Sequence, residues 1–220
     1  MSSFPNSPKL IKGGLVVLDP KGTTVKRTIA LQYNPDTLSR SYQVQGAGGD
    51  GGGERAQPFR LKGPAIETLK VEAEIDATDQ LEFPDQNPNA TTLGIAPQLA
   101  ALEALVNPTT VELLALDALA SSGTLEIIPP DAPLVVFVWS KNRIQPVRLT
   151  DLSFTEEAFD AALNPIRARV SLGLRVLSTD DLGFEHRGGS LFINHLRTRE
   201  ALAAKAGSAS LQVLGVEALP

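Results

Sequence analysis

The stretch IRARVSLGLRVL, residues 166–177, decides how the chain is expected to fold. Its residues alternate between two kinds with a period of two, which is typical of a β-strand with one face in a core. The apolar face carries Ile166, Ala168, Val170, Leu172, Leu174 and Val176. The polar face carries Arg167, Arg169, Ser171, Gly173 and Arg175. A strand this long is about twice the usual ~5–6 residues.

The residues before this strand predict its neighbours. In residues 144–155 the apolar positions shift phase by one residue, which predicts a second strand with a β-bulge near Thr150 and Asp151. Residues 134–139, LVVFVW, are apolar at every position, as in a strand that is covered on both faces. Turns are expected over residues 140–143 and 156–165.

The segment Ile66–Asp76, IETLKVEAEID, alternates in the same way. Its apolar face carries Leu69, Val71, Ala73 and Ile75, and its charged face carries Lys70, Glu72, Glu74 and Asp76. Further strands are expected over residues 9–18, 24–32 and 39–45. The sequence Tyr33-Asn34-Pro35-Asp36 separates the last two of these, because proline cannot donate to a sheet.

One helix is predicted with good start and stop signals, in GIAPQLAALEALVNP at residues 94–108. Pro97 suits a first helical position, and Asn107 with Pro108 ends the apolar stripe. Residues 111–119 predict a further turn or two of helix, residues 83–92 a polar loop, and residues 196–206 a short helix. The predicted fold is therefore mainly β with one helix (α+β): a rolled antiparallel sheet or β-barrel of seven or eight strands over residues 1–178, followed by a C-terminal tail over residues 179–220.

Composition excludes several classes of protein. The net charge of −5 argues against general binding to nucleic acid, which needs concentrated Lys and Arg. The chain has no cysteine, so disulfides, zinc fingers and a thiol nucleophile are excluded. No apolar run reaches the ~18 residues of a membrane span, and the first residues have no signal-peptide pattern. We therefore expect no direct membrane insertion, and synthesis and assembly in the cytoplasm without a signal peptide.

A glycine-rich stretch spells the dinucleotide-binding pattern G-x-G-x-x-G at residues 46–51. A phosphate site would need a helix directly after the glycines, but further glycines and Pro58 follow. We therefore interpret residues 46–63 as a flexible loop between two strands. The ends of this loop are expected to order only when a neighbouring subunit packs on them.

No set of residues resembles a catalytic or metal site. His186 and His195 have no metal-binding spacing, which favours solvated histidines in the tail. Ser190 lacks the second flanking glycine of a nucleophile elbow. The carboxylates Glu72, Glu74 and Asp76 are better explained as a solvated or subunit-facing strand surface than as acid–base catalysts. We therefore predict no enzyme activity, no catalytic residue, no metal and no cofactor.

The charged faces of the two long strands are the candidate contact surface. One is mainly acidic and the other carries arginines, so the two faces of neighbouring copies have complementary charge. In a closed ring of identical subunits, each such face would meet the other across a head-to-tail interface or would line the lumen. The residues of this candidate subunit-interface or lumen face are Lys70, Glu72, Glu74, Asp76, Arg167, Arg169 and Arg175.

Three segments together resemble, in order and spacing, the tube-type proteins of contractile injection systems, which are phage-tail-like particles. These segments are LQYNPDTLSRSY at residues 31–42, GIAPQLAALEALVNP at residues 94–108, and residues 133–177 with their closing hairpin. The family-motif residues are Leu31, Tyr33, Asn34 and Pro35; Gly94, Ile95, Pro97, Leu99, Ala100, Leu102 and Glu103; and Trp139 with Pro165-Ile166-Arg167-Ala168. The resemblance extends over residues 9–178.

This resemblance implies a hexameric ring of the tail-tube fold in the baseplate, where the inner tube starts above the spike. The ring would adapt the spike hub to the inner tube and initiate tube assembly. Its partners would be the tube subunit, the spike hub protein and other baseplate components. The longer chain with its tail favours this adaptor over the alternative of a bulk inner tube subunit. A standalone β-rich ligand-binding domain is the alternative from another class.

Two departures from the family pattern concern the end of the chain and one turn. Residues 179–220 lack the Gly-Asp-x-Leu pattern and the Trp-rich helix of the LysM-like module that many relatives carry. Ala161-Ala162-Leu163-Asn164 replaces the usual Asp-Gly turn before Pro165. The resemblance implies an injection particle that either stays in the cytoplasm or is released.

Overall fold

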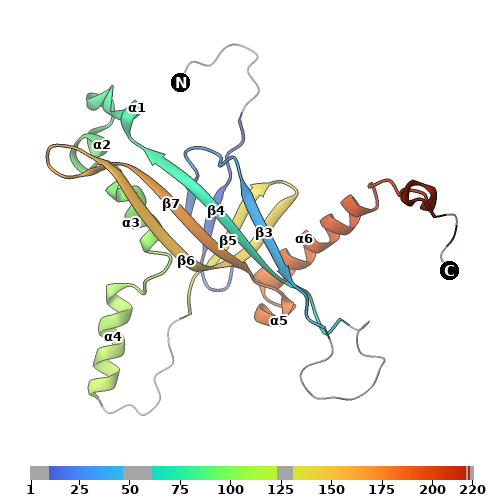
Figure 1. Ribbon diagram of the computed structural model, residues 1–220. Coiled ribbons are helices and arrows are strands. Elements are labelled where there is room, and N and C mark those ends of the chain that lie inside the picture. The colour runs from blue at the N-terminus through green and yellow to red at the C-terminus, as the bar shows by residue number, and fades with distance from the viewer. Residues whose placement is uncertain (1–9, 47–60, 123–130, 217, 219–220) are drawn as a thin grey trace.

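The computed structural model describes residues 10–46, 61–122, 131–216 and 218 (Figure 1). Seven strands form one antiparallel sheet in the order β2-β1-β5-β6-β7-β4-β3. Their bounds are β1 Gly14–Leu18, β2 Val25–Ala30, β3 Leu38–Gln43, β4 Ile66–Asp76, β5 Leu134–Ser140, β6 Arg143–Phe159 and β7 Pro165–Val176. The mainly β prediction is confirmed. The sheet is rolled but not closed into a barrel, because β2 and β3 are edge strands in the described part of the chain.

The β domain contains more helices than the one predicted with clear start and stop signals. The helices are α1 Thr78–Leu81, η2 Pro84–Gln86, α2 Pro88–Leu93, α3 Ala96–Glu103, α4 Thr110–Ser121, α5 Thr179–Leu182, α6 Arg187–Ala203 and η3 Leu211–Leu214. The loop predicted for residues 83–92 instead contains two short helices, since Pro84 and Pro88 each occupy a first helical turn, where a proline is tolerated. The extra helix predicted over residues 111–119 is confirmed as α4, which Thr109 and Glu112 start with a capping box.

The helix expected over residues 196–206 begins earlier, at Arg187. His186 caps it, since the Nδ1 atom of this histidine accepts a hydrogen bond of 3.1 Å from the backbone N–H of Gly188. Gly188 and Gly189 lie in the first turn of α6, where neighbouring atoms leave no room for a side chain. A Cβ on Gly189 would lie 1.9 Å from the carbonyl oxygen of Gly183. These glycines therefore permit close approach of α6 to α5.

The core lies on the inner face of the rolled sheet, with β7 at its centre. Leu174 of β7 lies opposite Leu69 of β4, and both side chains are fully buried. The helix α3 packs its buried Leu99 and Leu102 against this core, and α6 adds Phe192. The strand β5 is covered on both faces, as predicted, because Val136 belongs to a second apolar cluster on the outer face.

The predicted β-bulge in β6 is confirmed. The register with β7 shifts between Leu149 and Asp151, so that Thr150 is the extra residue. Gly173 lies opposite the bulge, and a Cβ there would lie 2.9 Å from the Cβ of Asp151. The strand continues to Phe159, further than expected, and the turn to β7 covers residues 160–164. The glycine-rich stretch at residues 47–60 lies outside the described residues.

Candidate assembly surfaces

The two charged strand faces lie side by side on the outer face of one subunit. β4 and β7 are hydrogen-bonded neighbours, and their register places Asp76 opposite Arg167 and Glu74 opposite Arg169. The Nε atom of Arg167 donates a hydrogen bond of 2.6 Å to the Oδ2 atom of Asp76. The complementary charges that we expected to meet between subunits are therefore neutralised in part within one subunit.

This pair changes the pKa of both groups. Partial burial raises the pKa of the Asp76 carboxyl, but hydrogen bonds from Thr78 and Arg167 outweigh it and hold that pKa below its usual range. The hydrogen bond to Asp76 and its negative charge raise the pKa of the Arg167 guanidinium. Both groups therefore keep their charges at neutral pH.

The other predicted charged residues divide into two groups. Arg169 forms an exposed ion pair with Glu157, at 3.0 Å between Nε and Oε1. Arg175 lies 2.7 Å from the Oδ1 atom of Asp181, and this ion pair joins β7 to α5. Lys70 and Glu72 are exposed and form no ion pair within the described residues. They remain the free charges of this surface.

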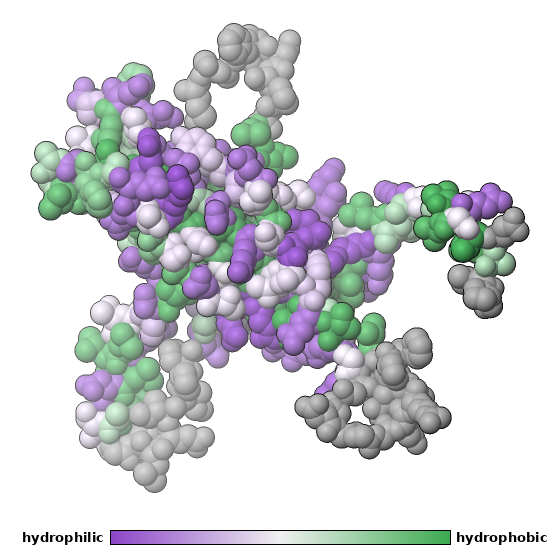
Figure 2. Space-filling model, in the orientation of Figure 1, coloured by the Kyte–Doolittle hydropathy of each residue, from purple (hydrophilic) through white to green (hydrophobic). Residues whose placement is uncertain are grey.

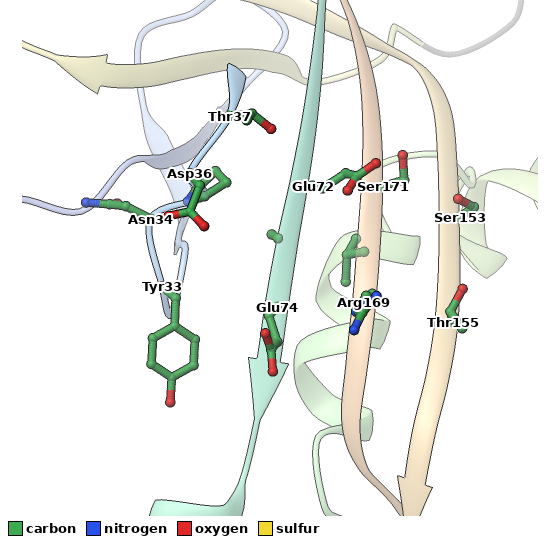
Figure 3. A pocket seen from close by; sticks show the side chains of 13 residues that line it. Tyr33, Asn34, Asp36, Thr37, Glu72, Glu74, Ser153, Thr155, Arg169 and Ser171 are labelled. Atoms are coloured by element: carbon green, nitrogen blue, oxygen red, sulfur yellow. The ribbon is translucent and has the colours of Figure 1, made fainter. Parts of the chain in front are cut away.

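A polar groove of about 620 Å³ lies over the charged face (Figure 3). One wall is the segment Tyr33 to Thr37, and the floor comes from β4, β7 and β6. Glu72, Glu74 and Arg169 lie along the floor, with hydroxyl groups beyond them on β6 and β7. Such a lining offers hydrogen-bond donors and acceptors to a polar segment of a neighbouring protein.

The motif around Tyr33 has a structural role that the sequence did not reveal. The side-chain amide of Asn34 accepts a hydrogen bond of 2.9 Å from the N–H of Gly13 and donates one of 2.8 Å to the carbonyl of Ile11. The Gln32 amide bonds both backbone groups of Asp76, at 2.6 and 2.9 Å. The side-chain amides of Asn34 and Gln32 therefore bond backbone groups that a neighbouring strand would otherwise pair with, whereas the Tyr33 side chain is half exposed.

The other two motif segments meet each other. Gly94 has φ +58° and a Cβ there would lie 2.1 Å from the carbonyl oxygen of Pro165. The same oxygen accepts a hydrogen bond of 2.8 Å from the N–H of the buried Ile95. Trp139 stacks on Phe137 with 5.9 Å between ring centroids.

The motif residues of α3 have different environments. Pro97 lies in its first turn and Leu102 is buried in the core. Glu103 is exposed. Most of the family-motif residues therefore hold the fold, and Glu103 is available for contacts with other proteins.

A buried polar network holds α6 to the sheet, and sequence reasoning missed it. Glu67 of β4 is buried and accepts hydrogen bonds from three side chains. They are Tyr42 at 2.6 Å, Gln145 at 2.9 Å and Arg199 of α6 at 3.2 Å. Arg199 also lies over the Tyr42 ring, 5.0 Å from its centroid. This network fixes the helix across the end of the roll.

The expectation that both histidines are solvated was wrong. His186 caps α6, and its Nε2 atom lies 2.9 Å from the carbonyl oxygen of Pro20. His195 is buried, and neither ring nitrogen has a hydrogen-bond partner in the described residues. Burial and the positive charge of Arg199 lower the pKa of His195. The imidazole is therefore neutral at pH 7.

No helix in the described part of the chain is long and apolar enough to cross a membrane. The described residues also contain no cluster of three or more potential metal-binding side chains.

Comparison with known proteins identifies the family of the chain. A search of curated proteins found no match. A family model described as contractile injection system tube protein matches residues 15–183, which include nearly all of the seven-stranded sheet. The chain therefore belongs to the family of contractile injection system tube proteins.

Proposed function

We propose that this protein forms a hexameric ring in the baseplate, where it adapts the spike hub to the inner tube and initiates tube assembly. Its work is mechanical, with no catalysis and no cofactor. Family membership supports a structural tube component over a standalone ligand-binding domain. The tube subunit, the spike hub protein and other baseplate proteins are the proposed partners.

The observation that carries the adaptor role is the added helix α6. The family match ends at residue 183, before this helix begins at Arg187. The buried contacts of Glu67 with Arg199 fix the helix firmly at one end of the rolled sheet. A bulk tube subunit stacks on copies of itself at both ends, whereas an adaptor meets a different protein at one end. The helix adds to one end of the subunit a surface that lies outside the family match, and an adaptor needs such a surface for its different partner.

Electron microscopy of the purified chain, alone and mixed with tube subunit or spike hub, tests this function. We expect single rings from the chain alone, and tubes that start from these rings once tube subunit is added. Long tubes formed by the chain alone would favour the bulk tube subunit instead. A strict monomer in every mixture would contradict any ring-forming role.

A further inference from the structure

The helix α4 has an apolar surface that the described part of the subunit leaves uncovered. Its sequence TVELLALDALAS contains two charged residues, Glu112 and Asp117, and apolar side chains lie all round it. A helix of this kind is normally buried on several sides. Here none of its residues is buried, and Val111 and Leu114 are 75% and 69% exposed. Figure 2 shows this apolar surface on a lobe that stands apart from the body of the protein.

The helix needs a partner for a second reason. Isolated helices of about 12–15 residues or fewer are marginal in water, because tertiary packing supplies most of helix stability. The capping box of Thr109 and Glu112 fixes where α4 starts, but supplies no packing. The helix would therefore gain stability from any surface that covered its apolar side chains.

The same chain has an apolar groove on its surface. It has a volume of about 530 Å³ and lies on the outer face of the sheet, where β1, β2, β5 and α6 meet. Val25, Val138, Ile144 and Leu191 are among its apolar lining residues. Among the described residues that line it, Arg187 is the only charged one. The groove is thus apolar with a positive charge, and α4 is apolar with two negative charges.

A larger apolar groove, of about 890 Å³, is less suitable for an acidic helix. It lies between β2 and α3, and its lining includes Glu74, Asp79 and Glu82 beside Lys12 and Arg27. Three acidic side chains there would repel Glu112 and Asp117, since like charges across an interface are unfavourable. Charge complementarity therefore selects the groove of Arg187.

We propose that α4 docks in the Arg187 groove of a second copy of this chain. Each subunit then gives a helix to one neighbour and receives a helix from the other. Such a head-to-tail contact builds a closed ring when its rotation closes. The proposal rests on the ring-forming function above and names the surfaces that would join the subunits.

Disulfide trapping tests the contact, because the chain has no cysteine of its own. One protein carries Leu114→Cys and an affinity tag, and the other carries Ile144→Cys in the groove. We expect a disulfide between the two proteins after mixing and oxidation, since this bond forms only when the Cβ atoms come within about 4.5 Å. The control Leu163→Cys, equally accessible at a turn tip, is expected to form no bond with Ile144→Cys.

A second variant measures the contribution of the contact. Leu114→Asp places a charge in the apolar contact and is expected to weaken self-association at least about tenfold. The matched change Leu163→Asp is expected to leave self-association unchanged. Leu114 is not buried in the subunit, so the Leu114→Asp variant and the parent protein, both diluted until monomeric, should have the same circular dichroism and the same thermal unfolding.

The outcomes separate this contact from the ring-forming role. Rings that persist with Leu114→Asp and give no α4–groove disulfide would overturn the docking and leave the ring in place. An intramolecular disulfide in a monomer that carries both cysteines would show that α4 covers its own subunit, and would also overturn the proposal. If the parent protein never associates, both proposals fail.

Discussion

The contact between Gly94 and Pro165 gives the sharpest prediction about the fold. At φ +58° and ψ −132°, Gly94 has a backbone conformation that residues with a side chain rarely adopt. In Gly94→Ala the new Cβ would lie 2.1 Å from the carbonyl oxygen of Pro165. The two segments must move apart, and the N–H of buried Ile95 then loses the hydrogen bond of 2.8 Å that it donates to this oxygen.

The magnitude follows from these two effects. Backbone strain costs about 1–3 kcal/mol, and an unsatisfied buried donor costs a further ~1–3 kcal/mol. Gly94→Ala is therefore expected to lower the free energy of unfolding by about 2–6 kcal/mol. Urea denaturation followed by the fluorescence of Trp139, the one tryptophan, measures this change.

Gly183→Ala is the matched control. Gly183 also has a positive φ, of +70°, but a Cβ added there would meet no heavy atom of the described residues within 4 Å. This variant should show the cost of strain alone, about 1–3 kcal/mol. If Gly94→Ala costs no more than Gly183→Ala, the contact with Pro165 does not determine the role of this glycine.

Three further predictions concern the turn before β7 and the network around α6. Among the described residues, Leu163 is the non-glycine residue with positive φ, +64°. Leu163→Gly should therefore raise the free energy of unfolding by about 0.5–1 kcal/mol. The control Ala162→Gly, in the same turn, should lower the free energy of unfolding. Glu67→Leu removes an acceptor from three donors and should cost about 3–5 kcal/mol, against ~1 kcal/mol for Tyr42→Phe, both by urea denaturation. The pKa of His195 is lowered in the folded state. The contribution of neutral His195 to stability is therefore complete above the unfolded pKa of about 6.5 and is lost as the pH falls below that value. Unfolding measured from pH 8 to pH 5 should show this loss of stability, and the loss should be smaller in His195→Leu.

The strands were predictable where one face is apolar and the other charged. The alternation in β4 and β7 fixed both strands to within a residue, and the phase shift in β6 located the bulge beside Thr150. The helices were harder, because their signals conflict. Prolines that often end helices start η2 and α2 here, and the glycine pair that argues against a helix is needed for the approach of α6 to α5.

The sequence contains a signal for only some members of the network around Glu67. Glu67 has the same strand phase as Leu69, and Gln145 the same phase as Val147, so both polar residues lie at core positions. That phase could have indicated two buried polar side chains. Their partner could not be inferred, because Arg199 lies 132 residues from Glu67 and no local pattern links them.

The position of the charged faces changes which forces we assign to assembly. Had the arginines and carboxylates been on separate surfaces, their attraction would have been the natural source of the subunit contact. Instead Arg167 pairs with Asp76, Arg169 with Glu157 and Arg175 with Asp181 inside one subunit. Charges that already have partners gain little from a second subunit, and exposed pairs are weak in any case. Uncovered apolar surface loses its contact with water only when a partner covers it, so α4 is the better source of binding energy.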